Sequence, residues 1–234
     1  MSVLLLRLKG PQQSWGVSSR YRTREAGQEP SKSGVVGLLA AAEGRPRDAD
    51  LQDLADLEFG VRVDQPGKLM SDYHTARVPG AANSSLSTRH YRVDAAYMAA
   101  VAGSAELIEA LAAAVDSPRF PLFLGRRACP APVDLLCGVV DGDDVEAALR
   151  DLEASPWLAS TWYRKEAPQQ VILPLARDAR PREVGDTVQD VPVSFDSRRR
   201  TYATRGVYRP APVLVENPDG QAETDPFFQT AKAG

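Results

Sequence analysis

The sequence predicts an α+β fold with a ferredoxin-like core, the arrangement also found in RNA-recognition (RRM-like) domains. Four strand-like apolar segments alternate with two helical segments in the order β-α-β-β-α-β. Shorter apolar pieces with frequent proline follow them, which indicates a smaller β-rich C-terminal subdomain. A chain of 234 residues is long enough for both parts. The fold class alone implies no function.

The first half of the core begins with a strand over residues 3–9, where Leu and Val on both faces favour a central position in the sheet. A helix follows through about residue 43, because Ser31 or Ser33 can cap its free N–H groups and Gly44 can end it. Residues 57–63 alternate between apolar and polar side chains, which predicts the second strand.

The second half begins with a polar excursion over residues 65–92, which we interpret as an extended hairpin. Residues 94–101 resume a strand. Ser104 then caps a helix through about Val115, whose apolar residues lie along one face. Residues 133–140 are the fourth predicted strand.

An acidic helix at 143–153 marks the change to the C-terminal part. Beyond it, we expect short strands at 170–175, 188–195 and 206–215. The predicted division of the chain is a core over 1–140, a small subdomain over 141–215 and a flexible tail over 216–234.

The charge of the chain is nearly balanced overall but uneven along the sequence. The net charge is −3, and 23 of the 28 basic residues are arginine, whose planar fork binds phosphate in a bidentate manner. Basic residues gather at 20–32 and 195–210, while 141–153 is acidic. A uniformly basic nucleic-acid sleeve is therefore excluded, but local basic patches can still bind a polyanion.

The sequence favours a cytoplasmic protein without a cofactor. It has no run of 18 apolar residues and no signal-peptide pattern at its start. Two cysteines, Cys129 and Cys137, and two histidines, His74 and His90, make a poor zinc site. We expect the two cysteines to be free thiols, although their spacing would also suit a short hairpin disulfide.

The segment Ser31-Lys32-Ser33-Gly34 at a helix start is the first candidate site. Free N–H groups, hydroxyls and a lysine suit a phosphate, whereas ordinary capping with an exposed lysine is the plainer interpretation. A nucleotide-binding loop needs glycine immediately before the lysine and again five positions earlier, where Ser31 and Ala26 stand. ATP binding is therefore not expected.

Two further candidates remain open from the residues alone. His74 and His90, each beside a tyrosine, could serve as acid and base in metal-free RNA cleavage, or be ordinary imidazoles. Arg126 and Arg127 follow Gly125 and could hold a phosphate backbone, or pair with the acidic residues at 141–153.

Four motifs in order resemble the CasD family of CRISPR-associated proteins, most closely its type I-E members. They are Leu6-Arg7-Leu8-Lys9-Gly10-Pro11-Gln12-Gln13-Ser14-Trp15-Gly16, Pro30-Ser31-Lys32-Ser33-Gly34-Val35-Val36-Gly37-Leu38-Leu39, Asp72-Tyr73-His74-Thr75 and Phe123-Leu124-Gly125-Arg126-Arg127-Ala128-Cys129-Pro130. The resemblance covers about residues 3–140 and is weaker over 141–215.

The resemblance implies a subunit of the RAMP superfamily that belongs to the Cascade surveillance complex of antiviral defence. Such a subunit has a ferredoxin-like core with an inserted β-hairpin thumb, here at about 65–93. It binds and caps the 5′ handle of the CRISPR RNA, contacts the backbone subunit CasC and the large subunit CasA, and meets target DNA only through the complex. No membrane partner is implied.

The resemblance also implies that the protein is not an enzyme and has no catalytic or metal-binding residues. The RNA-binding residues that it suggests are Arg24, Lys32, Ser33, Gly34, Arg89, Tyr91, Arg126, Arg127, Arg199 and Arg205. Trp15 could pack as a lid or stack on a base. The alternative function is a metal-independent endoribonuclease that processes CRISPR precursor RNA, as related proteins of another subtype do.

Overall fold

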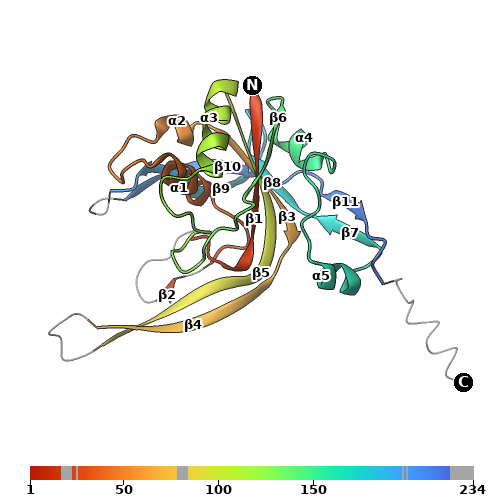
Figure 1. Cartoon of the computed structure of the whole chain (residues 1–234), viewed down its shortest axis with the longest axis horizontal. Coiled ribbons are helices and arrows are strands. Elements are labelled where there is room, and N and C mark those ends of the chain that lie inside the picture. Colours follow the sequence, from red (N-terminus) through yellow and green to blue (C-terminus); the bar gives the residue numbers. More distant parts are fainter. Residues whose placement is uncertain (17–22, 25, 78–83, 197, 199, 222–234) are drawn as a thin grey trace, which may run out of the picture.

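The computed structural model describes residues 1–16, 23, 24, 26–77, 84–196, 198 and 200–221. These residues form a mixed α/β structure built around one large, mainly antiparallel sheet (Figure 1). Within the described residues, none of the helices is both long enough and apolar enough to span a bilayer.

The elements are, in chain order, β1 (Ser2–Gln13), β2 (Thr23–Arg24), α1 (Lys32–Glu43), α2 (Gln52–Ala55), β3 (Glu58–Gln65), β4 (Lys68–Ala76), β5 (Ser85–Gly103), α3 (Ala105–Asp116), β6 (Leu136–Asp141), α4 (Val145–Arg150), α5 (Thr161–Glu166), β7 (Gln170–Leu173), β8 (Leu175–Asp178), β9 (Asp186–Ser194), β10 (Thr201–Tyr208) and β11 (Val213–Glu216).

The strand order of the main sheet is β6-β1-β5-β3-β8-β10-β9, and β2 and β4 pair with β5 beside this path. The central position predicted for the first strand is confirmed, because β1 lies between β5 and β6. Its side chains alternate between two separate cores, with Leu4 and Leu6 in the first core and Val3 and Leu5 in the second. This alternation explains why the strand is apolar on both faces.

Helices α1 and α3 contribute to the first core. The predicted caps of both helices are confirmed. The backbone N–H of Gly34 donates to the Ser31 hydroxyl at 3.3 Å, and the N–H of Leu107 donates to the Ser104 hydroxyl at 3.3 Å. Gly44 ends α1 with φ of +80°, a conformation that favours glycine.

The second core lies on the other face of the sheet. It contains residues of α4, the segment 157–159 and the separate two-stranded sheet of β7 and β11. Arg62 of β3 is completely buried near this core and donates two hydrogen bonds to the Asp64 carboxylate, at 2.6 and 3.0 Å. Burial raises the pKa of Asp64, while the charge of Arg62 acts in the opposite direction.

The first strand is longer than predicted, because β1 continues past Gly10-Pro11 to Gln13. Strand β6 pairs with β1 only from Ser2 to Leu6. Among the described residues, one side of β1 therefore has no partner strand at Pro11, and a proline that lacks an N–H is tolerated there. The fourth predicted strand starts later, at Leu136, since Val133 is fully exposed and unpaired in the sheet.

The predicted C-terminal subdomain is not separate in the sheet topology. β8 pairs with the free side of β3, and β10 and β9 continue the same sheet. An edge strand with unpaired N–H and C=O groups favours such an addition. Only β7 and β11 form a sheet of their own, and β11 includes Glu216. Of the predicted tail, Asn217 is buried and bonded to two backbone carbonyls, and residues 222–234 lie outside the described part.

The polar excursion predicted as a hairpin is β4 paired antiparallel with the first half of β5, from Lys68 opposite Val93 to Ala76 opposite Ser85. We call these residues, 68–76 and 85–93, the arm. Figure 1 shows the arm extending away from the helices. Residues 78–83, at the predicted tip of the hairpin, lie outside the described residues.

Candidate nucleic-acid interface

The structure divides the predicted RNA-binding residues into two groups. Backbone and side-chain contacts join Arg24 to Arg89 and Arg126 to Tyr91, and Arg127 follows Arg126 in the loop 124–130. We call this first group, Arg24, Arg89, Tyr91, Arg126 and Arg127, together with the loop 124–130, the arm base. In the second group, Lys32 and Arg205 lie in an ion-pair cluster with acidic residues of β8 and β9, and Ser33 and Gly34 follow Lys32 in the first turn of α1. Arg199 lies outside the described residues.

In the arm base, the loop 124–130 is joined to the end of β1. The N–H of Ser14, just after β1, donates to the Leu124 carbonyl at 3.1 Å. Gly125 has φ of +85°, and a Cβ on it would overlap the carbonyl oxygen of Ser14. Glycine is therefore required where the loop meets the end of β1. The N–H of Cys129 closes the loop by donating to the Arg126 carbonyl at 2.8 Å.

Arg126 joins this loop to the arm. Its guanidinium carbon lies 5.0 Å from the centroid of the Tyr91 ring, and its Nη1 donates to the His90 carbonyl at 3.2 Å. The Ser14 hydroxyl donates to the same carbonyl at 3.0 Å. Tyr91 is only 2% exposed and belongs to the first core, so its ring faces the core and Arg126 and not the solvent.

Arg127 is exposed and forms no ion pair with the part of the chain that the structure describes. The backbone of Arg24, in the short strand β2, pairs in parallel with the backbone of Arg89. Arg89 lies opposite Asp72 in the arm, and its Nε is buried without a hydrogen-bond partner among the described residues. A buried donor without a partner is unusual and marks a position where an added acceptor would be favourable.

Sequence reasoning did not select two other residues at the arm base, Ser14 and Arg92. Arg92 donates from Nε to the Gly27 carbonyl at 3.3 Å, and the Gly27 N–H donates to the Trp15 carbonyl at 2.7 Å. These bonds tie the segment after β1 to the arm. The signal for Arg92 was the run of polar residues at 89–92 in a segment that becomes apolar at Ala95.

Lys32 and Arg205 do not present free cations. The Lys32 ammonium lies 2.9 Å from Asp178, and Arg205 contacts both Asp178 and Asp190 at 2.7 Å. Asp190 also accepts the backbone N–H of Lys32 at 2.8 Å. Burial opposes the charge of Arg205, but the bonds and charges of the two aspartates outweigh it and raise the pKa of the guanidinium.

The Ser31–Gly34 segment is occupied by protein contacts as well. The indole of Trp15 is fully buried, donates from Nε1 to Gln13 at 3.0 Å and packs against Gly34. Stacking of Trp15 on a base is therefore excluded in this structure, and its role in packing is confirmed. Ser33 is part-buried, and its hydroxyl lies 3.5 Å from that of Ser31.

The two histidines proposed as an acid–base pair lie on opposite faces of the arm. Ser71 faces His90 in the register, and His74 faces Ser87. Directly opposed residues share a face and successive residues alternate, so His74 and His90 point to opposite sides. His74 is paired with Asp72 at 2.5 Å. The two imidazoles therefore cannot act together on one bond.

The cysteines are free thiols, Cys129 buried and Cys137 part-buried. Burial raises the pKa of Cys129, which keeps it in the unreactive thiol form. Among the described residues, no three His, Cys, Asp or Glu side chains gather as metal ligands would.

Comparison with known proteins places this geometry in a family. The family model described as CRISPR-associated protein (Cas_Cas5) matches residues 3–208. The chain is 35% identical over 175 residues to the CRISPR system Cascade subunit CasD of Escherichia coli (strain K12), an overlap that covers 65% of this chain and 77% of that protein.

Two solved structures share the fold. A chain of a CRISPR RNA-guided surveillance complex superposes with a TM-score of 0.73 and 29% identity, over 98% of both chains. A crystal structure of a Cas protein gives a TM-score of 0.63 and 36% identity, over 93% of this chain and 97% of the other. The resemblance predicted from four sequence motifs is confirmed.

Proposed function

Because this chain belongs to the CRISPR-associated Cas_Cas5 family, we propose that it is the non-catalytic Cascade subunit that binds the 5′ handle of the CRISPR RNA. The observation that carries this proposal is the 35% identity to Cascade subunit CasD across 77% of that protein. The surveillance-complex chain supports it independently, since the likeness there extends over 98% of both chains.

The strand order supports a finer description of the fold. The first four strands of the path, β6-β1-β5-β3, are antiparallel to one another, with α1 after β1 and α3 after β5. This is the arrangement expected of a ferredoxin-like core. In this proposal, the arm is the inserted thumb, and β8, β10 and β9 extend the core sheet.

We assign the RNA contacts to the arm base. Within the described part of the chain, Arg127 is exposed without an ion-pair partner and Arg89 has a buried donor without an acceptor. Both suit a phosphate backbone, because arginine binds phosphate with charge-assisted bonds. Lys32 and Arg205 already have carboxylate partners, so their role is to hold α1 against β8–β10.

In the same proposal, CasC and CasA are the protein neighbours, and target DNA is met through the assembled complex. The opposite placement of His74 and His90 supports a subunit that binds RNA without cleaving it. Cytoplasmic location follows from membership of such a complex.

The test is co-expression with the neighbouring Cascade subunits and a CRISPR array, purification through a tag on this chain, and sequencing of the bound RNA. We expect enrichment of guide RNAs with a uniform repeat-derived 5′ end. Recovery of this chain without the neighbouring subunits, or without guide RNA, contradicts the proposal.

A point variant tests the arm base. Arg127→Ala should weaken guide retention and reduce the dependence of binding on salt, because one phosphate contact is lost. Arg182→Ala removes another exposed arginine, far from the arm in sequence, and serves as the control. Equal guide occupancy and salt dependence in the two variants contradict this assignment.

Catalysis is tested separately. We expect purified protein incubated with a labelled repeat hairpin, without metal, to leave the RNA intact. Cleavage that His74→Ala or His90→Ala abolishes would overturn the non-catalytic role.

A further inference from the structure

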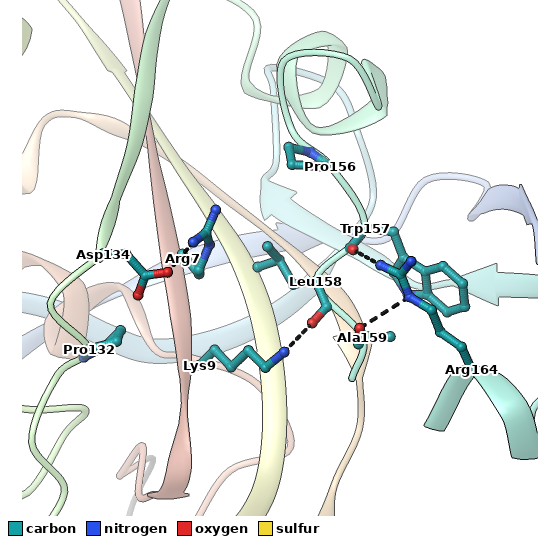
Figure 2. Close-up of a pocket in the computed structure, with 9 residues that line it drawn as sticks. All are labelled: Arg7, Lys9, Pro132, Asp134, Pro156, Trp157, Leu158, Ala159 and Arg164. Carbon is teal, nitrogen blue, oxygen red and sulfur yellow. Dashed lines mark hydrogen bonds and ion pairs between the residues drawn. The ribbon is translucent and has the colours of Figure 1, made fainter. Parts of the chain in front are cut away.

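A pocket of about 410 Å³ lies on the opposite face of β1 from the first core, outside the arm base. Figure 2 shows that it is bordered by β1, by the loop before β6 and by the segment 156–159. Its side chains include three cations, Arg7, Lys9 and Arg164, and one acid, Asp134. The excess of positive charge indicates an anionic ligand.

Two of these cations have donors for which the described residues provide no acceptor. The Arg7 guanidinium pairs with Asp134 through Nη1, while its Nε is buried without a hydrogen-bond partner among the described residues. Lys9 donates one hydrogen bond from Nζ, to the Leu158 carbonyl at 2.8 Å, and an ammonium has three donors. Asp134 is 58% exposed, so solvent screens its repulsion of an anion.

The third cation is held in place by the backbone of the pocket wall. Arg164 donates to the Trp157 carbonyl at 2.6 Å and to the Ala159 carbonyl at 3.2 Å, and lies 4.8 Å from the Trp157 ring centroid. These contacts fix the segment 157–159 in position without using all five donors of the guanidinium. The pocket wall is thereby preorganised, which lowers the entropic cost of binding.

The remaining wall of the pocket is apolar, with Pro132, Pro156 and Leu158 lining it. An apolar wall beside cations matches the two parts of a nucleotide, a flat base and a phosphate. The volume lies in the range typical of sites for whole small molecules, and an acidic side chain of a protein would leave most of it empty.

We propose that this pocket binds one unpaired nucleotide of the guide RNA, with its phosphate on Arg7 and Lys9 and its base against Pro132, Pro156 and Leu158. Lys9 and Ser14 are five residues apart on the same stretch of chain, about 17 Å in an extended strand. RNA held at the arm base can therefore reach the pocket within a few nucleotides, by passing from the first-core face of β1 to the opposite face. The inference rests on the proposed function, because it names a second position for the same RNA.

Site-specific photocrosslinking in the assembled particle identifies the occupant. Val133 is fully exposed between two pocket-lining residues, so a benzoylphenylalanine at this position samples the pocket entrance without altering its interior. We expect ultraviolet light to link it to one nucleotide of the guide. The control position is Val184, which is 92% exposed and does not line the pocket.

A linkage from position 133 to a protein subunit alone, or no linkage at all in a particle that carries guide RNA, overturns the inference. The same particle still reports on the proposed function, since guide RNA is recovered from it or is not. The two failures are therefore distinguishable.

A charge-matched pair of variants measures the contribution of the pocket. Arg7→Gln/Lys9→Gln should bind the guide about tenfold more weakly than the unaltered chain, and the salt slope should fall by about 0.7 for the lost phosphate contact. Arg47→Gln/Arg182→Gln removes the same charge from two exposed positions and should change neither quantity by as much. Equal losses in the two double variants contradict a specific pocket.

Discussion

Gly34, in the first turn of α1, lies against the six-membered ring of the Trp15 indole. A Cβ on Gly34 would sit 2.7 Å from Cε3 of Trp15, closer than packed atoms approach. The indole is fully buried and bonded to Gln13, so it has no space into which to move. The glycine therefore sets how closely α1 approaches the end of β1.

Gly34→Ala should destabilise the protein by about 1–3 kcal/mol, the usual cost of overpacking. Chemical denaturation followed by tryptophan fluorescence measures the change. Gly16→Ala is the control, because no atom lies within 4 Å of the added methyl group. Comparable stability of the two variants would show that α1 can shift.

Arg205→Met should lower the free energy of unfolding by about 3 kcal/mol or more, because it leaves the buried Asp190 carboxylate with less positive charge beside it. The matched control is Arg209→Met, at the residue that follows β10. Arg209 pairs with Glu29 while 50% exposed, and such pairs contribute about 1 kcal/mol at most.

Thermal and chemical unfolding should therefore show that Arg205→Met is clearly less stable than Arg209→Met. If Arg205→Met instead folds as stably as Arg209→Met but loses guide RNA, then Arg205 contacts RNA and the cluster is not structural.

Gly125→Ala should lower the free energy of unfolding by at least about 2 kcal/mol. The alanine would have a positive φ, and its Cβ would overlap the Ser14 carbonyl. Because the loop carries Arg126 and Arg127, guide retention should fall as well. Ala128→Ser, at an exposed position of the same loop, should change neither. Retention of both stability and guide binding in Gly125→Ala would refute the close contact between this loop and β1.

Glu183 makes the stability of the folded protein depend on pH in the acidic range. Two hydrogen bonds from Arg177, at 2.7 and 2.8 Å, together with one from the Arg180 N–H, lower the pKa of Glu183 to about 2 from 4.5. A carboxylate with a lower pKa in the folded state contributes stability that is present above its unfolded value and is lost as the pH falls toward its folded value.

Glu183→Gln should therefore be less stable than the unaltered chain at about pH 7, and the difference should shrink between about pH 4.5 and pH 2. Urea midpoints at several pH values measure it. Glu153→Gln is the control, because it removes an exposed carboxylate, in the turn after α4, that has no arginine partner among the described residues. A difference that stays constant over this range would mean that Glu183 titrates alike in both states.

Local patterns determined much of this protein. The apolar alternation of β1, the Ser31 and Ser104 caps and the αL glycine at 44 depend on neighbours within a few residues, so the first strand and the two main helices were predictable. Each of the four motifs that indicated the family is likewise a continuous stretch of sequence, so it could be recognised without the fold.

Only the tertiary structure decided which charges have partners. Lys32 meets Asp178 across 146 positions of sequence, so the lysine that suggested a phosphate site is held by a carboxylate that no local pattern connects to it. The extension of the sheet by β8, β10 and β9 has the same origin, because strand pairing joins segments far apart in the chain. Arg7 and Lys9, two charges on one face of an apolar strand, were visible in the sequence from the start. The fold was needed to show that this face lines a pocket, in which Arg7 has a donor without an acceptor among the described residues.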